Sequence, residues 1–264
     1  MEISIREALD SDIEGIVELF CESGGNPYNW NREKWTHNYR DYPDGTPISL
    51  VATINGQIVG HYGMQPIKIG QIPAMLGLHA YVASSQRGLT IISALMKEVD
   101  RVCGLRGAQL ICGFANPKFS LIKSTIFKWK TPCWLGFQTG FSEEDAEIMK
   151  FRKFYFNYSD DWLVWRFGSK KDKYVSIYFD SQKNKHIQLL KFCGGNLRSE
   201  NQNLEVWSTR SMYSTNQPDR FCQPFSIKVF EPELLNEGIL NCENWSIDMG
   251  DSDTFQYTSE ESSK

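Results

Sequence analysis

The segment from His79 to Met96 combines an ionisable side chain, a tight turn and a helix start. Its sequence predicts a strand, a turn at Arg87–Gly88 and then a helix. A helix N-terminus presents free backbone N–H groups and the positive end of the helix dipole, which together bind anions such as a pyrophosphate. Gly88 has no Cβ, so the backbone can turn and approach a phosphate closely. The segment therefore predicts an anion site built mainly from backbone.

Histidine is suited to accept a proton from a reacting group, because its unperturbed pKa of about 6.5 lies close to working pH. The chain has four histidines, at positions 37, 61, 79 and 186. His79 precedes the predicted turn on its strand, and His61 lies on the returning arm of a predicted hairpin. We favour His79 as a catalytic base, with His61 second. The alternative for either residue is a core histidine satisfied by a hydrogen bond.

The first part of the chain must position these groups. A short strand from Ile3 to Ile5 is followed by a helix, whose start fits a capping box at Ser11 to Glu14. Ile48 to Ile54 alternates like a half-buried strand, and Gln57 to Met64 returns as a second strand. Between them stands Asn55–Gly56, the dipeptide typical of a two-residue hairpin turn.

Two further strands and two helices complete this part. Strands are predicted from His79 to Ala83 and from Ala108 to Phe114, and a helix follows Asn116–Pro117 to about Phe127. The helix after Gly88 has apolar residues at helical spacing, which predicts one buried face. These residues are Ile91, Ile92, Leu95, Met96, Val99 and Cys103.

This order of elements, together with the run that ends the fourth predicted strand, resembles the GNAT superfamily of acyl-CoA-dependent N-acetyltransferases. In that family a strand ends in a Val-x-Pro-x-x-Arg-Gly-x-Gly-Ile-like run. Val82, Arg87–Gly88 and Ile91 match it, while Thr90 stands where a second glycine is usual and Ser84 where proline is common. The alternative is an ordinary strand, turn and helix with one glycine.

The resemblance implies an α/β (α+β) GNAT fold with a mixed, mostly antiparallel sheet, followed by a smaller β-rich half. We expect an acyl-CoA-binding domain at residues 1–139, a β-rich domain at 140–253, which resembles a reduced GNAT half, and an acidic tail at 254–264.

A narrower resemblance concerns GNAT proteins encoded with surface-polysaccharide pathways. Gly113 to Pro117 is similar to their Gly-Phe-Pro-Asn run, and Trp129 matches a tryptophan that ends the next helix. Residues 165–167, 244–245 and 250–253 also resemble their C-terminal half. The implied acceptor is an amino sugar, free or nucleotide-linked. Trp162, Trp165 and Tyr174 could stack on a sugar ring, although buried core tryptophans are the commoner case.

The resemblance also implies which residues act. The loop holds the pyrophosphate of acetyl-CoA, the co-substrate, and the Val82 N–H stabilises the oxyanion when an amine attacks directly in a ternary complex. Lys123 stands where many relatives have a tyrosine acid, so no general acid is assigned. Asn116 has an alternative role as a turn initiator. The cofactor-binding candidates are Val82, Arg87, Gly88, Leu89, Thr90, Ile91, Asn116 and Ser120.

Composition narrows the class of protein. The formal net charge of −4 gives no reason to expect nucleic-acid binding, and no apolar run of membrane-spanning length is present. Seven scattered cysteines without a Cys-x-x-Cys pair indicate reduced thiols in a cytoplasmic protein, with no metal site. The N-terminus opens with a strand, so we expect no signal peptide.

The expected partner is a small-molecule amine, and a homodimer stays open. Two alternative functions also stay open. One is a non-catalytic CoA-binding or interaction module of GNAT fold, because fold does not fix function. The other is acylation of a small amine or amino acid instead of a sugar.

Overall fold

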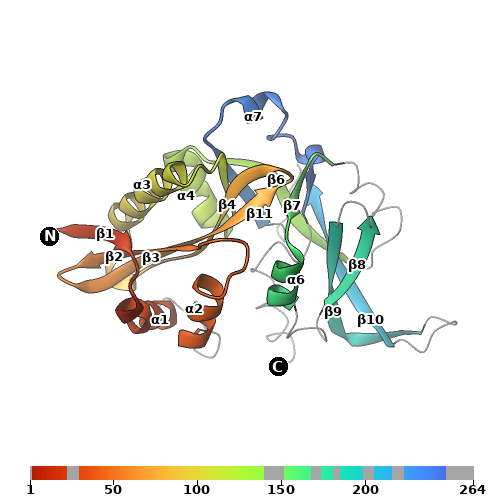
Figure 1. The fold of residues 1–264 in the computed structure, drawn as a ribbon, viewed down its shortest axis with the longest axis horizontal. Coiled ribbons are helices and arrows are strands. Elements are labelled where there is room, and N and C mark those ends of the chain that lie inside the picture. Colours follow the sequence, from red (N-terminus) through yellow and green to blue (C-terminus); the bar gives the residue numbers. More distant parts are fainter. Residues whose placement is uncertain are drawn as a thin grey trace. The chain divides into compact units, whose positions relative to one another are not determined.

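The fold is described from a computed structural model over residues 2–22, 30–139, 152–167, 174–180, 185–198, 205–215 and 223–247 (Figure 1). The chain forms two compact units. The first comprises residues 1–68 and 72–113, and the second comprises residues 69–71 and 114–264. Each unit is described separately below.

The first unit is built on a mixed, mostly antiparallel sheet. Its strands lie in chain order: β1 (Ile3–Glu7), β2 (Ile48–Ile54), β3 (Gln57–Ile69), β4 (Ile72–Val82) and β5 (Leu110–Phe114). β1, β2 and β3 pair antiparallel, whereas β4 and β5 pair parallel. The predicted hairpin at Asn55–Gly56 is confirmed, and both residues have the positive φ that such a turn requires, 51° and 81°.

Helices cover both faces of this sheet. α1 (Ile13–Glu22) and α2 (Arg32–Tyr39) lie on one face, and α3 (Leu89–Leu105) lies on the other (Figure 1). Two glycines of β3 allow α3 and α2 to pack closely against the sheet. A Cβ on Gly60 would lie 2.8 Å from Ile91 of α3, and a Cβ on Gly63 would lie 1.8 Å from the Tyr39 hydroxyl of α2.

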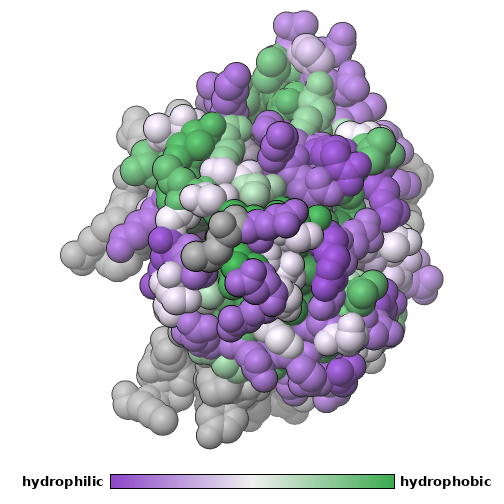
Figure 2. Space-filling view, turned by 90° about the vertical axis from the view of Figure 1, so that its left-hand side faces the viewer, coloured by the Kyte–Doolittle hydropathy of each residue, from purple (hydrophilic) through white to green (hydrophobic). Residues whose placement is uncertain are grey.

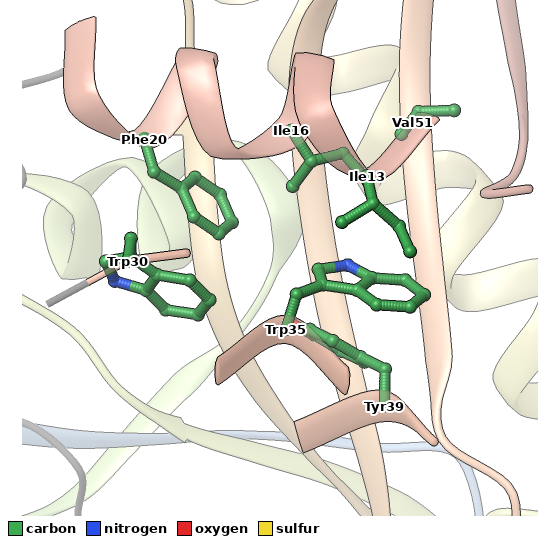
Figure 3. Close-up of a cluster of buried hydrophobic side chains, with 7 residues drawn as sticks. All are labelled: Ile13, Ile16, Phe20, Trp30, Trp35, Tyr39 and Val51. Atoms are coloured by element: carbon green, nitrogen blue, oxygen red, sulfur yellow. The ribbon is translucent and has the colours of Figure 1, made fainter. Parts of the chain in front are cut away.

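The face with α1 and α2 holds a core rich in aromatic side chains (Figure 3). In this cluster, side chains of α1 point toward those of α2 and of the segment that precedes α2. Each side chain of the cluster is less than one-twentieth exposed. The cluster comprises Ile13, Ile16, Phe20, Trp30, Trp35, Tyr39 and Val51. On the outside, one face of the molecule is mainly hydrophilic, with hydrophobic residues in small groups (Figure 2).

The predicted capping box before α1 is wrong. The Asp12 carboxylate, in the short helix η1 (Asp10–Asp12), accepts the N–H of Leu9 at 2.7 Å and two hydrogen bonds from Arg6 at 2.5 and 2.9 Å. The bonds from Arg6 lower the pKa of this carboxyl. Glu14 instead pairs with Arg32 at 2.8 Å, which links α1 to α2.

The second unit contains an antiparallel sheet in the order β11 (Gln223–Val229), β6 (Lys130–Thr139), β10 (Glu205–Thr215), β9 (Lys185–Arg198) and β8 (Tyr174–Asp180). β7 (Phe154–Asn157) pairs parallel with β12 (Trp245–Ser246). The remaining elements are α4 (Pro117–Phe127), α6 (Asp160–Phe167), α7 (Glu233–Asn236) and η5 (Cys242–Asn244). The compact units divide after Gly113, so β6 lies in the same unit as its partners β11 and β10. The domain bounds expected from the change of sequence texture near residue 140 stay a prediction.

Trp162 is not available to stack on a sugar in this structure. Its side chain is 4% exposed and lies parallel to the Tyr158 ring, with centroids 3.4 Å apart. Trp165 lies 5.9 Å from it in the same aromatic group. The core alternative therefore holds for Trp162.

Candidate active site

The N-terminus of α3 is open to solvent. Gly88 is its N-cap, with φ 156° and ψ −172°, a conformation that is essentially restricted to glycine. No side chain caps the helix, and its first turn carries no acidic residue. The first N–H groups of any helix lack intrahelical partners, and here residues 87–90 are exposed. The predicted anion site therefore has the required donors.

The loop before α3 is anchored at its start. The short helix η3 (Ser84–Gln86) follows β4, and the Ala83 N–H donates to the carbonyl oxygen of Val59 at 2.9 Å. Ser84 donates through its hydroxyl to the Glu22 carboxylate of α1 at 2.5 Å, with its N–H at 3.3 Å from the same oxygen. Ser84, which replaces the usual proline, thus gains a structural role.

β4 continues past its pairing with β5. The register joins Ala74, Met75 and Leu76 to Leu110, Ile111 and Cys112. β4 then extends from Gly77 to Val82, so its last part, including His79, lies beyond that ladder. The strand leads directly to the exposed loop, which places Val82 between the histidine and the helix start.

His79 has an unusual backbone conformation. Its φ of 53° is in the left-handed region, although it lies within a strand. Such a conformation costs on the order of 1–3 kcal/mol in a residue other than glycine and persists only where the surroundings enforce it. Its side chain is half-buried. Its Nδ1 lies 2.9 Å from the Tyr39 hydroxyl, and the Trp30 ring packs edge-on at 4.3 Å.

The side chain of His61 contacts the main chain of His79. Its Nδ1 lies 2.8 Å from the His79 carbonyl oxygen, and its Nε2 lies 2.9 Å from the Ser49 hydroxyl. The side chain is fully buried, and burial lowers the pKa of His61 to about 4. The two predicted histidines are thus brought together, but His61 is neutral near pH 7 and enclosed.

Sequence reasoning missed Tyr39 and Ser49, the side-chain partners of the histidines. Tyr39 is separated from His79 by 40 residues, and only the docking of α2 on the sheet brings them together. Ser49 and His61 lie near each other on paired strands, since Ser49 is opposite Gly63 and His61 opposite Val51. The Asn55–Gly56 turn alone would place His61 opposite Leu50, but a register shift between Ala52 and Thr53 moves the pairing by one residue, so the turn could not have identified Ser49.

The remaining predicted site residues, Asn116 and Ser120, lie in the second unit and have local partners, as does Lys123, to which no role is assigned. The Asn116 side chain accepts the Phe119 N–H at 2.9 Å and caps α4. Ser120 is 5% exposed, and its hydroxyl lies 3.1 Å from that of Ser226. Lys123 is 2% exposed, with its Nζ 4.0 Å from the centroid of the Trp129 ring.

Within the part of the chain that the structure describes, no group of three or more histidine, cysteine, aspartate or glutamate side chains is placed to hold a metal ion. No helix of that part is long and apolar enough to cross a membrane.

Comparison with known proteins identifies the fold. No protein-family model and no curated protein matches the sequence. A conserved protein of Enterococcus faecalis V583, described as a probable N-acyltransferase, is similar with a TM-score of 0.59 and 10% identity, over 88% of this chain and 73% of its own. A GCN5-related N-acetyltransferase from Kribbella flavida is similar with a TM-score of 0.57 and 10% sequence identity. The match covers 87% of this chain and 72% of the other.

At this identity the likeness concerns architecture alone. The described elements agree with it: a mixed, mostly antiparallel sheet, a strand that outruns its parallel neighbour, and a helix that starts at a glycine. The chain has the GNAT acetyltransferase fold.

Proposed function

We propose that this protein is an acyl-CoA-dependent N-acyltransferase, which moves an acetyl or other acyl group to an amine in a ternary complex. The observation that carries the proposal is the uncapped, exposed N-terminus of α3 at the end of β4. In a GNAT fold this is a place where an anionic cofactor could be held by backbone donors.

Different residues of the loop are proposed to bind different parts of acetyl-CoA. The N–H groups of residues 88–91 bind the pyrophosphate, helped by the positive end of the α3 dipole. Arg87 is exposed at the rim and adds a positive charge. The Val82 N–H is the proposed donor to the oxyanion, because a backbone donor fixed in a strand needs little reorganisation.

His79 is the proposed general base. It is half-buried, whereas His61 is fully buried with both ring nitrogens at hydrogen-bond distance from protein atoms. A base must reach the ammonium proton directly or through one water. His79 meets that requirement better, so we assign His61 a supporting role. Asn116 and Ser120 are not needed for this site, since their side chains have partners within the second unit.

The proposed acceptor is an amino sugar, free or nucleotide-linked. The support is the resemblance of Gly113 to Pro117 to GNAT proteins of surface-polysaccharide pathways. The core position of Trp162 removes one stacking candidate from this proposal. A small amine or an amino acid is the alternative acceptor.

Thermal melting with and without acetyl-CoA tests the function, with free CoA and NAD as controls. A ligand that binds only the folded state stabilises it by about 2.7 kcal/mol at a hundredfold excess over its dissociation constant. We expect an upward shift with acetyl-CoA and CoA but not with NAD. No shift at millimolar acetyl-CoA would contradict the proposal. Binding without turnover on any amine of a broad screen would favour a non-catalytic CoA-binding module.

A further inference from the structure

We infer that Ser49, His61 and Tyr39 form a positioning array that fixes both the main chain and the imidazole ring of His79. The inference deepens the proposed function and depends on it for its catalytic consequence. None of the three side chains touches a substrate; each acts through His79.

The first arm of the array holds the main chain. A carbonyl oxygen can only accept a hydrogen bond, so the 2.8 Å contact requires the proton of His61 to be on Nδ1. Burial keeps the His61 ring neutral, so Nε2 carries a lone pair and accepts the Ser49 hydroxyl at 2.9 Å. Ser49 and the His79 carbonyl therefore select one tautomer and one ring orientation of His61.

This arm bears on the acyl site because of the conformation of His79. A left-handed residue inside a strand redirects the chain that follows it, and here β4 continues to Val82. The ring Nδ1–H of His61 is a buried donor that bonds to the carbonyl oxygen of His79. Loss of this donor would let β4 relax at His79 and would move the Val82 N–H, the proposed oxyanion donor.

The second arm holds the ring. For Nε2 of His79 to accept a proton, Nδ1 must carry hydrogen, and the Tyr39 oxygen 2.9 Å away is placed to accept it. The position of this hydroxyl depends on a glycine, since a Cβ on Gly63 would lie 1.8 Å from it. Trp30 packs edge-on against the same ring. The ring of His79 is thereby held by groups from three parts of the first unit.

Both ionisable and uncharged side chains contact His79. Tyr39 of α2 and His61 of β3 are titratable groups with a hydrogen bond to His79. Phe20 of α1 and Trp30 supply uncharged rings. The chain has four histidines, so the imidazole ¹⁵N spectrum of the labelled full-length protein can be assigned by single substitutions.

The test compares Tyr39→Phe with Tyr42→Phe. Tyr42 is equally buried and donates to the Pro66 carbonyl at 2.6 Å, so its substitution removes a buried hydrogen bond without touching His79. We expect Tyr39→Phe to change the tautomer ratio of His79 and to lower kcat at least tenfold, with the Kd of acetyl-CoA within twofold of wild type. Tyr42→Phe should leave the imidazole spectrum and kcat unchanged.

The first arm of the array is tested by comparing a variant that removes the His61 donor with a variant that restores a donor. His61→Leu removes the donor to the His79 carbonyl, whereas His61→Asn keeps an N–H near the position of Nδ1. We expect His61→Leu to lower kcat at least tenfold and His61→Asn to recover most of that loss. Ser49→Ala, a milder change that should still fold, is expected to return part of His61 to the other tautomer.

Two results would overturn the inference. One is an unchanged His79 spectrum in Tyr39→Phe, and the other is an equal loss of kcat in Tyr39→Phe and Tyr42→Phe. The spectra are recorded without acyl-CoA, so they decide the positioning of the ring independently. Failure of the wild-type protein to bind acetyl-CoA would instead contradict the proposed function.

Discussion

Helices α3 and α4 each begin just after a strand, but their first turns are built differently. α3 starts at Gly88 without a side-chain cap, whereas α4 starts at Asn116, whose side chain accepts the Phe119 N–H at 2.9 Å. Pro117 follows at the first helical position of α4 and has no N–H to offer. The chain therefore caps the first turn of α4 with its own side chain and leaves the first turn of α3 without a side-chain cap.

The two units also differ in how deeply their polar side chains are buried. In the second unit, the Ser120 hydroxyl is buried against Ser226. In the first unit, the array behind His79 is buried, but His79 itself is half-buried. A helix N-terminus or a polar cluster is thus informative only when its donors and acceptors are followed to their partners.

The largest effect is expected at His79. His79→Asn should lower kcat by roughly 10²–10⁴-fold, the usual contribution of a general base. Asparagine tolerates the left-handed conformation, so the fold should persist. Lys128→Asn is the matched control, because Lys128 is a left-handed residue of the second unit with φ 61°. Steady-state kinetics with equal losses in both variants would contradict a special role of His79.

The next effect concerns the dependence of stability on pH. The pKa of His61 is about 4 in the folded protein and near 6.5 when unfolded, so the unfolded state binds the extra proton between these values. His61 should therefore remove up to about 3 kcal/mol of stability as pH falls from 6.5 to 4, and none above pH 7. Urea unfolding at pH 7 and 4.5 measures this change.

His61→Asn is the reference for that experiment, since it lacks the titrating ring and keeps the other ionisable groups. We expect its free energy of unfolding to fall less than that of wild type between the two pH values. Parallel losses in the two proteins would show that His61 is not held neutral by burial.

The third effect is loss of acyl-CoA affinity in Thr90→Glu. A carboxylate in the first turn of α3 interacts favourably with the helix dipole but repels a bound pyrophosphate. We expect the Kd of acetyl-CoA to rise about 10–100-fold by calorimetry, since close like charges cost about 1–4 kcal/mol. Melting temperature should not fall.

Leu105→Glu places the same charge at the far end of α3, where Leu105 is 73% exposed. It should leave the Kd within twofold of wild type. An equal loss of affinity in Leu105→Glu would point to a long-range charge effect instead of a site at Thr90.

The smallest effect is expected at the cap of α4. Asn116→Ala should cost about 1 kcal/mol in the free energy of unfolding, and Asn116→Ser should recover most of it, because serine also caps helices. The Kd of acetyl-CoA should stay within twofold in both. Recovered stability with lost affinity in Asn116→Ser would instead give Asn116 the CoA contact that the family resemblance implies.

Local signals in the sequence predicted the local features of the first unit. The Asn55–Gly56 turn, the buried face of α3 and the helix start at Gly88 each depend on neighbouring residues, and each is confirmed. β4 was predicted too short, because Pro73 interrupts its pattern and the turn after β3 depends on Gly70 at φ 59°.

Features that depend on tertiary packing were not predictable in this way. The contact of Tyr39 with His79 requires α2 to dock over Gly63, and nothing in the local sequence of either residue encodes it. The left-handed conformation of His79 likewise has no signal in the neighbouring sequence. The hydrogen bond from the Leu9 N–H to the Asp12 carboxylate was missed because this carboxylate also pairs with Arg6 on the preceding strand.

Backbone amide chemical shifts of ¹⁵N-labelled protein, with CoA and pantetheine added separately, show whether the N-terminus of α3 binds a pyrophosphate. CoA carries the pyrophosphate and pantetheine does not. If the open N-terminus of α3 holds the pyrophosphate, the amides of residues 88–91 shift with CoA but not with pantetheine. Equal shifts with both ligands, shifts confined to residues 118–120 of α4, or no shifts at all would contradict the account.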